Sequence, residues 1–412
     1  MGLGFNIMLN SEGNFMRIHV AKMLVLMVVA CLVCPTITLA KPPLKVGLLG
    51  PFTGHFAAYG EQMELGIRAY MELNGEQVAG RQITLLTRDT TGVAPDVAAK
   101  YARQLVQEDK VDFLIGLALA PNALAVAPIV SKSRTPTILF NATSAGLTER
   151  SPYFMRVSFE LPPVVAPLAK WAAGQGMKRV YTLVGDYDSG RDAERAFVRA
   201  FAGAGGEVVG SAQMPIDAKS YDAYLQRAVQ DKPEAVFVSF PPPALAFMAA
   251  VEKFDLQGKG IKLLSTGDIV SDYELPLMGD GVNGVISAFH YSETHDSAEN
   301  KRFLAAYRKI AGPGARPSFL AVQAFDGMAA LYQVMKQLNG RAARTSAVMA
   351  ALRKLRFESP RGAIAIEPRS RDILQTTYIR RTEKRDQEYY NVEVESFPPA
   401  EGTPAGRTTM HR

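Results

Sequence analysis

The sequence predicts an α/β protein made of two similar Rossmann-like lobes, each with a parallel β-sheet covered by helices. Three observations support this prediction. Apolar segments alternate with amphipathic helical segments from residue 44 onward, an order typical of parallel sheets. The alternation starts again near residue 160 without a short-period repeat of the sequence. Segments that lack either periodicity then predict a three-strand hinge between the lobes, at Tyr153–Leu161, Ala288–Thr294 and Arg356–Arg361.

Apolar runs and helical periodicity place the elements of the first lobe. In one predicted helix, Leu65, Ala69 and Leu73 recur on a single face. The strands expected here are Leu44–Leu49, Arg81–Thr87, Val111–Ile115 and Thr137–Phe140, and the helices are Tyr59–Asn74, Pro95–Gln107 and Ala123–Ser131.

The second lobe repeats this order and is followed by a helical segment. Its strands are expected at Arg179–Val184, Glu207–Met214, Ala235–Ser239, Ile261–Ser265 and Val282–Ala288, and its helices at Pro163–Ala173, Arg191–Ala204, Tyr221–Gln230 and Leu245–Phe254. Later helices are expected at Ala298–Ile310, Ser318–Gln337 and Ala347–Leu355, before short strands at Ala363–Ile366 and Thr376–Arg380.

These elements predict how the chain divides into domains. The N-terminal lobe should comprise residues 41–157 and 290–358, and the C-terminal lobe residues 158–289 and 359–395. Residues 396–412 are rich in Pro, Gly and Thr, a composition that predicts a disordered tail.

The first 40 residues have the features of a secretory signal peptide. Basic residues precede the apolar run Met23–Val33, and Thr38-Leu39-Ala40 offers a cleavage site after Ala40. We therefore expect export to the periplasm, and a mature chain that lacks both cysteines. A lipoprotein acylated at Cys31 is the competing interpretation, and Met16 is an alternative start.

Composition excludes several classes of function. The chain has 46 basic and 40 acidic residues among 412, a net charge of +6, but the basic residues are scattered, so no nucleic-acid partner is expected. The nearest histidine pair, His290 and His295, fits no zinc spacing. No Gly-x-Ser-x-Gly elbow is present. We expect neither catalysis nor a metal or other cofactor.

Four sequence motifs together resemble those of the branched-chain amino-acid (leucine/isoleucine/valine-binding) receptors of ABC transporters. In chain order they are KVGLLGPFTGHFAAYGEQMELGIRAYMELNG, FLIGLALAPNALAVAPIVSKSRTPTILFNATSAGLTE, GDYDSGRDAERAFVRAFAGAGGEVVG and NKRFLAAYRKIAG. The resemblance spans residues 44–394. It implies the two-lobed clamshell of type I periplasmic binding proteins, a small-molecule ligand held between the lobes, and the membrane subunits of an ABC permease as partners.

Segments that follow strands are the candidate ligand contacts. The turn Gly50–Gly54, with Thr53, offers backbone N–H groups that suit an anion. The resemblance implies that the Asn141 carbonyl faces the ligand's ammonium group, that the hydroxyl and N–H of Thr143 bind its carboxylate, and that Asp268 neutralises the ammonium. Ala142, between Asn141 and Thr143, is a further candidate contact. A helix cap by Thr143 or Ser144 and a turn role for Asp268 remain the alternatives.

The chain also departs from the family pattern. Leu117–Pro121, which contains Ala120, replaces the serine-rich turn that binds a carboxylate, and Ser189 replaces an aromatic residue of the second lobe. The segment Asp186–Asp192 resembles a subgroup associated with aromatic and other hydrophobic carboxylates. Candidate wall residues for a more apolar pocket, each of which can instead belong to the core, are Phe52, Tyr59, Phe140, Tyr187, Phe240 and Tyr291.

The sequence therefore predicts a receptor that captures an amino acid or a hydrophobic carboxylate for transport. Two alternatives stay open. One is a sensory subunit that uses the same closure for signalling, and the other is an exported α/β enzyme.

Overall fold

The computed structural model describes residues 41–215, 218–240 and 244–399. The predicted signal peptide, with Cys31 and Met16, and most of the predicted tail lie outside the described residues. In the described part of the chain, none of the helices combines the length and apolar character needed to cross a membrane.

The first sheet forms the core of one lobe. Its strand order is β2-β3-β1-β4-β5-β6, and all neighbours are parallel except β2 and β3. The strands are β1 (Leu44–Gly50), β2 (Gln77–Val78), β3 (Arg81–Asp89), β4 (Phe113–Gly116), β5 (Thr137–Leu139) and β6 (Phe154–Arg156). The helices of this lobe are α2 (Ala57–Asn74), α3 (Pro95–Arg103), α4 (Ala120–Ser133), α9 (Ala298–Ala311), α10 (Phe319–Gln337) and α11 (Thr345–Leu352).

Alternation along the strands puts helices on both faces of this sheet. Leu48 and Ile115 pack in the cluster that contains α2 and α10, whereas their neighbours Leu49 and Leu114 pack with α3 and α4. Successive side chains of a strand point to opposite faces, so a strand covered on both faces is apolar throughout. This is the reason the strands appear as continuous apolar runs in the sequence.

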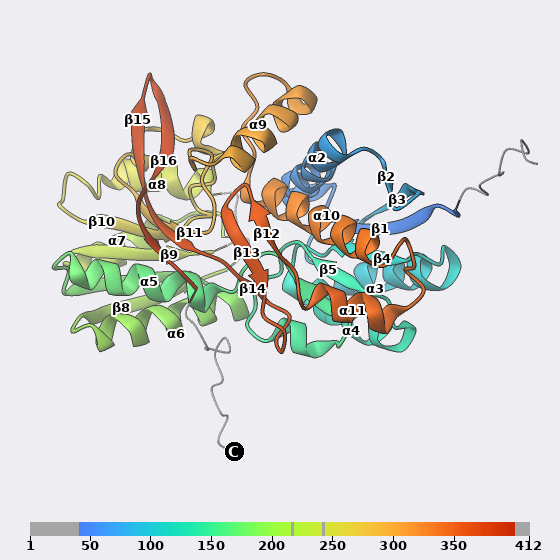
Figure 1. The fold of residues 1–412 in the computed structure, drawn as a ribbon. Coiled ribbons are helices and arrows are strands. Elements are labelled where there is room, and N and C mark those ends of the chain that lie inside the picture. Colours follow the sequence, from blue (N-terminus) through green and yellow to red (C-terminus); the bar gives the residue numbers. More distant parts are fainter. Residues whose placement is uncertain (1–40, 216–217, 241–243, 400–412) are drawn as a thin grey trace, which may run out of the picture. The chain divides into compact units, whose positions relative to one another are not determined.

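The second sheet has the strand order β16-β15-β11-β10-β9-β7-β8. The strands β7 to β11 are mutually parallel, and β15 and β16 add an antiparallel edge. Helices α5 and α6 cover one face, and α7 and α8 cover the other (Figure 1). The strands are β7 (Arg179–Gly185), β8 (Glu207–Met214), β9 (Ala235–Ser239), β10 (Lys262–Thr266), β11 (Ile286–Phe289), β15 (Thr377–Arg385) and β16 (Glu388–Phe397), and the helices are α5 (Leu161–Gly174), α6 (Asp188–Gly203), α7 (Asp222–Gln230) and α8 (Leu245–Phe254).

The predicted two-lobed α/β fold is confirmed, with local differences in the elements. Strand β11 begins at Ile286 rather than Val282, because residues 280–282 form a 3₁₀ turn. The predicted crossings are not irregular throughout, since they contain β6 and also β12 (Arg356–Ser359). Strand β12 pairs with β13 (Gly362–Ile366), which pairs with β14 (Ile373–Leu374), in a small antiparallel sheet. The predicted domain limits within these crossings stay a prediction.

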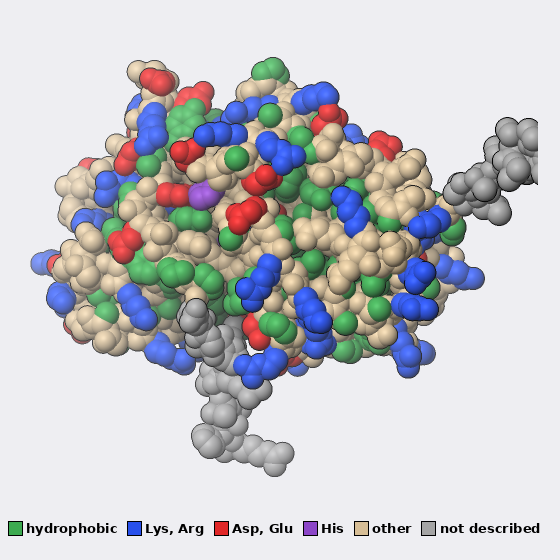
Figure 2. Space-filling model, viewed as in Figure 1, with side chains coloured by type: hydrophobic (Ala, Val, Ile, Leu, Met, Phe, Trp, Pro, Cys, Tyr) green, Lys and Arg blue, Asp and Glu red, His purple; other side chains and the backbone are tan. Residues whose placement is uncertain are grey.

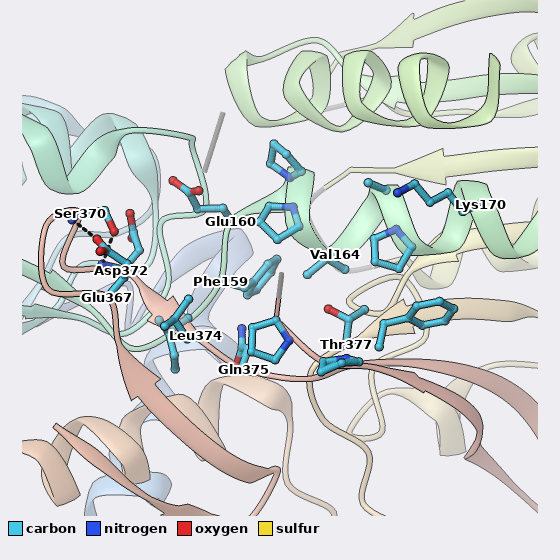
Figure 3. A pocket seen from close by; sticks show the side chains of 18 residues that line it. Phe159, Glu160, Val164, Lys170, Glu367, Ser370, Asp372, Leu374, Gln375 and Thr377 are labelled. Atoms are coloured by element: carbon cyan, nitrogen blue, oxygen red, sulfur yellow. Dashed lines mark hydrogen bonds between the residues drawn. The ribbon is translucent and has the colours of Figure 1, made fainter. Parts of the chain in front are cut away.

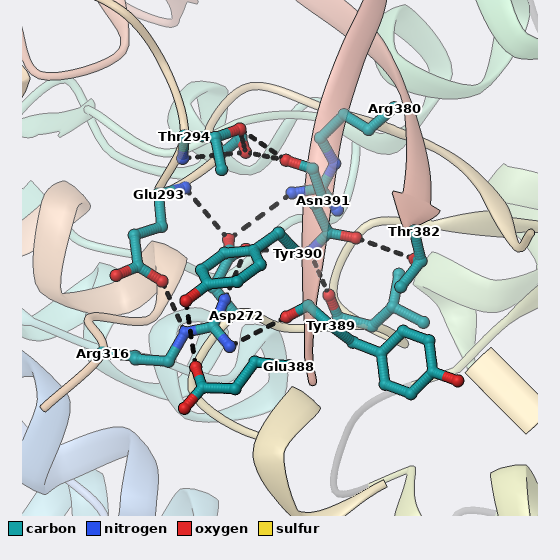
Figure 4. Close-up of polar contacts among 12 residues, drawn as sticks. Asp272, Glu293, Thr294, Arg316, Arg380, Thr382, Glu388, Tyr389, Tyr390 and Asn391 are labelled. Atoms are coloured by element: carbon teal, nitrogen blue, oxygen red, sulfur yellow. Dashed lines mark hydrogen bonds and ion pairs between the residues drawn. The ribbon is translucent and has the colours of Figure 1, made fainter. Parts of the chain in front are cut away.

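Strand β16 corrects the start of the predicted disordered tail. It extends to Phe397, where it pairs with Thr377 of β15, so residues 396 and 397 belong to the second sheet. Buried Asn391 fastens this strand, because its amide donates to Asp272 and to the Val270 carbonyl (Figure 4). Sequence periodicity missed β16 because an edge strand with one exposed face contains many charged residues.

On the face shown in Figure 2, Lys and Arg side chains are spread among Asp and Glu side chains rather than gathered in one patch.

Buried arginines join the segments that cross between the two sheets. Arg361, which is 1% exposed, donates to Asp326 of α10 at 2.8 Å and to the Val157 carbonyl after β6. It also donates to the side chain of Gln375, which precedes β15. Burial raises the pKa of Asp326, while the nearby guanidinium favours its charged form. The Arg361 side chain thus joins α10, the segment after β6 and the residues before β15.

We predict that Asp326→Asn strongly destabilises the protein. The change keeps the shape of the side chain but leaves the Arg361 charge buried without a counter-ion, which should lower the free energy of unfolding by about 3 kcal/mol or more. Urea denaturation measures this loss. The control is Asp296→Asn, because Asp296 pairs with Lys301 at the surface and such a pair contributes about 1 kcal/mol or less. Equal losses in the two variants would contradict the prediction.

Candidate ligand-binding cleft

A cavity of about 70 Å³ lies where the carboxyl ends of strands from both sheets face each other. Its wall comes from the segments after β1, β3, β4 and β5 of the first sheet and after β7 and β10 of the second, with additions from the hinge and α10. The lining residues are Phe56, Tyr59, Val93, Ala118, Leu119, Ala120, Pro121, Asn141, Thr143, Phe159, Tyr187, Ser189, Asp268 and Phe319. One water molecule takes about 10–15 Å³ of such space, so the cavity suits a ligand of roughly one ring.

The first lobe contributes a polar edge to this cavity. The Nδ2 group of Asn141 donates to the Ala118 carbonyl at 2.9 Å, which leaves its buried Oδ1 without a partner. The Asn141 backbone carbonyl, expected to face the ligand, accepts a hydrogen bond from Ser158. Thr143 lies two residues farther along the same loop. Helix α4 begins at Ala120 without a side-chain cap. Its second residue, Pro121, has no N–H group, so the N–H groups of Ala120 and Asn122 and the helix dipole are what favour an anion here.

The second lobe contributes Tyr187, Ser189 and Asp268. The Oδ1 atom of Asp268 is buried and has no hydrogen-bond partner, although the residue as a whole is partly exposed because it faces the cavity. Burial raises the pKa of Asp268 to about 6, against the opposing effect of hydrogen bonds from Thr266 and from backbone N–H groups. Burial also raises the pKa values of Tyr59 and Tyr187, so both phenols stay protonated at neutral pH.

Close backbone packing sets the position of the Tyr187–Ser189 segment. A Cβ atom at Gly190 would lie 2.0 Å from the Gly185 carbonyl oxygen, so only glycine lets α6 start this close to the end of β7. The Ser189 hydroxyl lies 2.9 Å from that of Ser144, in the Thr143 loop of the other lobe. The two lobes therefore meet through a direct hydrogen bond at the edge of the cavity.

Seven of the predicted contact residues line the cavity: Tyr59, Ala120, Asn141, Thr143, Tyr187, Ser189 and Asp268. Their loops come together because the carboxyl ends of parallel strands lie at one edge of a sheet. The loops that the sequence singled out therefore meet at this cavity, and their contact with a ligand stays a prediction.

The predicted anion site at Thr53 is instead occupied by a carboxylate of the protein itself. Asp89, at the end of β3, accepts hydrogen bonds from the Phe52 N–H at 2.7 Å and from the Thr53 hydroxyl at 2.5 Å. These hydrogen bonds lower the pKa of Asp89 below its usual value. Thr53 is exposed and does not line the cavity.

Three other predicted contact residues lie behind the cavity wall. Ala142 is 1% exposed, and its carbonyl accepts a hydrogen bond from Arg156. Tyr291 is fully buried and donates to Asn300. Phe240 packs in an aromatic cluster of the second lobe. Two more wall candidates, Phe52 and Phe140, also do not line the cavity.

Sequence reasoning missed several of the lining residues. Phe159 lies in a predicted crossing, and Phe319 begins a helix that looks like ordinary core. The two rings and the Phe289 ring contact one another. Only the contact between the hinge and α10 brings them to the cavity. The other missed residues are Phe56, Val93, Ala118, Leu119 and Pro121.

A larger groove of about 400 Å³ lies beside the hinge, between the start of α5 and the β14–β15 segment (Figure 3). Its wall includes Pro163, Val164, Leu374 and Phe397. It is not at the carboxyl ends of the parallel strands. We therefore place the candidate site in the smaller cavity, where polar groups from both lobes converge. In the described residues, no cluster of His, Cys, Asp and Glu could hold a metal ion.

We predict that Asp268→Asn stabilises the unliganded protein above pH 6. The pKa of Asp268 is about 6 in the folded chain and about 3.9 in an unfolded one, so the folded state binds more protons between these values. The free energy of unfolding therefore falls as pH rises through this window, by about 3 kcal/mol in all. Removing the carboxylate restores this stability.

Denaturation at pH 4 and pH 8 tests this expectation. The variant should exceed the unchanged protein in stability at pH 8 and approach it at pH 4, whereas the exposed control Asp296→Asn should show no gain at pH 8. A variant that is less stable than the unchanged protein at pH 8 would contradict the prediction.

Comparisons with known proteins place the chain in a family. Residues 43–387 match the family described as periplasmic binding protein. The chain is 37% identical over 356 residues to the Leu/Ile/Val-binding protein homolog 6 of Brucella suis. The matched region covers 86% of this chain and 91% of the relative.

Two solved structures extend this similarity to the fold. A solute-binding protein of an ABC transporter from Rhodopseudomonas palustris BisB5, in complex with 3,4-dihydroxybenzoic acid, is 38% identical with a TM-score of 0.84, covering 87% of this chain and 98% of that one. Another from R. palustris, in complex with 4-hydroxybenzoate, is 35% identical with a TM-score of 0.83 over the same shares. The chain therefore belongs to the periplasmic binding protein family and has the fold of ABC-transporter solute-binding proteins.

Proposed function

We propose that this protein is a solute-binding receptor that captures a small aromatic carboxylate between its lobes and delivers it to the membrane subunits of an ABC permease. The observation that favours this ligand class is a ring-sized cavity lined by Phe56, Tyr59, Phe159, Tyr187 and Phe319. The two relatives from R. palustris, bound to hydroxybenzoates, support the same class.

The arrangement of the cavity suggests how such a ligand is held. Among the described residues, no Lys, Arg or His lines it. An entering carboxylate must therefore rely on hydroxyl and N–H donors, and Thr143 and the start of α4 offer these on the first lobe. The aromatic side chains bury the ring, which supplies most of the binding free energy through loss of apolar surface from water.

Closure follows from contacts to both lobes. A ligand that touches Thr143 on one lobe and Tyr187 or Asp268 on the other stabilises the closed form over the open one. The Ser144–Ser189 hydrogen bond at 2.9 Å joins the two lobes, so separating them would break it, and the closed surface is what a permease can recognise. The chemistry required is binding alone.

A branched-chain amino acid is the second candidate ligand. The Brucella suis relative is named a Leu/Ile/Val-binding protein homolog, and the unpaired Oδ1 of Asp268 is a suitable partner for an ammonium group. We further propose that export uses the N-terminal segment as a signal peptide cleaved after Ala40. A sensory role in place of transport would use the same closure.

We predict that aromatic acids stabilise the protein and that leucine does not. Benzoate, 4-hydroxybenzoate, 3,4-dihydroxybenzoate and leucine are to be compared in a thermal-shift screen, followed by calorimetry. A ligand at 100 times its Kd adds about 2.7 kcal/mol of stability. Stabilisation by leucine without any response to the aromatic acids would reject the proposed ligand class.

We predict that Thr143→Val weakens the binding of every aromatic carboxylate by about 10- to 150-fold. The change keeps the side-chain shape and removes a hydroxyl that donates to the ligand carboxylate, a hydrogen bond worth about 1.5–3 kcal/mol. Calorimetric titration measures the loss, and the melting temperature of the unliganded protein should hardly change.

The matched control for this variant is Thr87→Val, the same change at an exposed position of β3 outside the cavity. Its affinity should equal that of the unchanged protein. An unaltered Kd for Thr143→Val would exclude the contact, and a lowered melting temperature without ligand would indicate a helix-capping role instead.

A further inference from the structure

The cavity wall contains two acceptor atoms that nothing in the described structure satisfies. They are Asp268 Oδ1 on the second lobe and Asn141 Oδ1 on the first, both buried and both without a hydrogen-bond partner. A buried polar group without a partner destabilises the folded protein. Because both atoms are acceptors, the wall favours a ligand that brings hydrogen-bond donors in addition to its carboxylate.

Hydrogen bonds to other parts of the protein hold the Asn141 side chain and the loop that bears Asp268 in place. The Asn141 amide is held by its donation to the Ala118 carbonyl. Asp268 follows β10 directly, and the neighbouring Gly267 carbonyl accepts a hydrogen bond from buried Arg380 at 3.0 Å. The loop that bears Asp268 is therefore fixed in place before the ligand arrives.

A ligand carboxylate beside Asp268 would be repelled by the like charge, whereas a ring hydroxyl can donate a hydrogen bond to Asp268. The donors that a carboxylate needs lie at Thr143 and α4 on the first lobe, and Asp268 lies on the second lobe. A hydroxyl on the ring, away from the ligand carboxylate, can meet Asp268 while the carboxylate stays with the first lobe. It also costs less to bury than an ammonium group.

On this basis, and resting on the proposed function, we propose that the bound aromatic acid carries a ring hydroxyl and that Asp268 accepts the hydrogen bond from it. Asp268 then selects hydroxylated aromatic acids over unsubstituted ones. The same hydrogen bond ties the ligand to the second lobe and so couples recognition of the hydroxyl to closure.

The dependence of this selectivity on pH follows from the charge of Asp268. A hydroxyl donor stabilises the ionised carboxylate and lowers its pKa from the value of about 6 in the empty cavity. The preference for a hydroxylated acid over benzoate should therefore grow between pH 5 and pH 7. Taking the ratio of the two affinities cancels effects common to both ligands. Burial raises the pKa of Glu274 to about 7, and because its charge repels that of Asp268, the two carboxyl groups titrate together in this range. The groups that face Asp268 are Thr266, the N–H groups of residues 268 and 269, Arg380, Glu274, Tyr59 and Tyr187.

Calorimetric titrations of benzoate, 3-hydroxybenzoate and 4-hydroxybenzoate test the proposal. At pH 7 the unchanged protein should bind the better hydroxybenzoate about 10- to 150-fold more tightly than benzoate, as expected for a hydrogen bond to a charged group. In Asp268→Ala this ratio should fall to near one, because benzoate has no ring hydroxyl whose hydrogen bond could be lost. Retained benzoate binding also shows that the variant folds.

The Thr143→Val variant serves as the matched control, because it should weaken all three acids and leave their ratio unchanged. Equal affinity of the unchanged protein for all three acids overturns the inference but leaves the proposed function intact. Failure of every aromatic acid to bind overturns the proposed function itself. If the unchanged protein binds leucine and Asp268→Ala does not, Asp268 binds an ammonium group, and the inference is overturned. An equal loss of affinity for all three acids in Asp268→Ala also overturns the inference.

Discussion

Three buried arginines, Arg156, Arg361 and Arg380, satisfy the backbone of the segments where the chain passes between its two sheets. These segments run through the interior, where a carbonyl without a hydrogen bond is costly. Arg361 donates to carbonyls after β6, and Arg380 donates to the Tyr291 carbonyl after β11. Each guanidinium offers five donors in a rigid plane, so a single side chain can serve several segments at once.

The same arginines also position the candidate site. Arg156 donates to the carbonyls of Ala142 and Ser144, the residues on either side of Thr143. Arg380 donates to the carbonyl of Gly267, directly before Asp268. The two loops that face the cavity from opposite lobes are therefore each anchored to the hinge. A rigid support of this kind preorganises polar groups, so less conformational entropy is lost when a ligand binds.

The cavity itself reduces the stability of the empty protein. Asp268 is held in a site that raises its pKa to about 6, and Asn141 Oδ1 has no donor. A core built for stability alone would pair such groups. Their unpaired state gives a ligand with matching donors more to gain on binding.

The sequence by itself determined the two-lobed fold and the loops of the site. Strands buried on both faces must be apolar throughout, and such apolar runs are visible in the sequence alone. The edge strand β16 has one charged face and therefore shows no apolar run. Parallel strands bring their carboxyl ends together, so the loops after them meet at the cavity. The resemblance to the receptor family is what named Asn141, Thr143 and Asp268 within these loops. Only the tertiary structure decided which groups were already paired. Asp89 accepts hydrogen bonds from the Phe52 N–H and the Thr53 hydroxyl, so this turn is already paired. The contact between the hinge and α10 brings Phe159 and Phe319 to the cavity, and Asp268 Oδ1 has no hydrogen-bond donor. Such pairings depend on contacts between residues far apart in the chain, about which local periodicity carries no information.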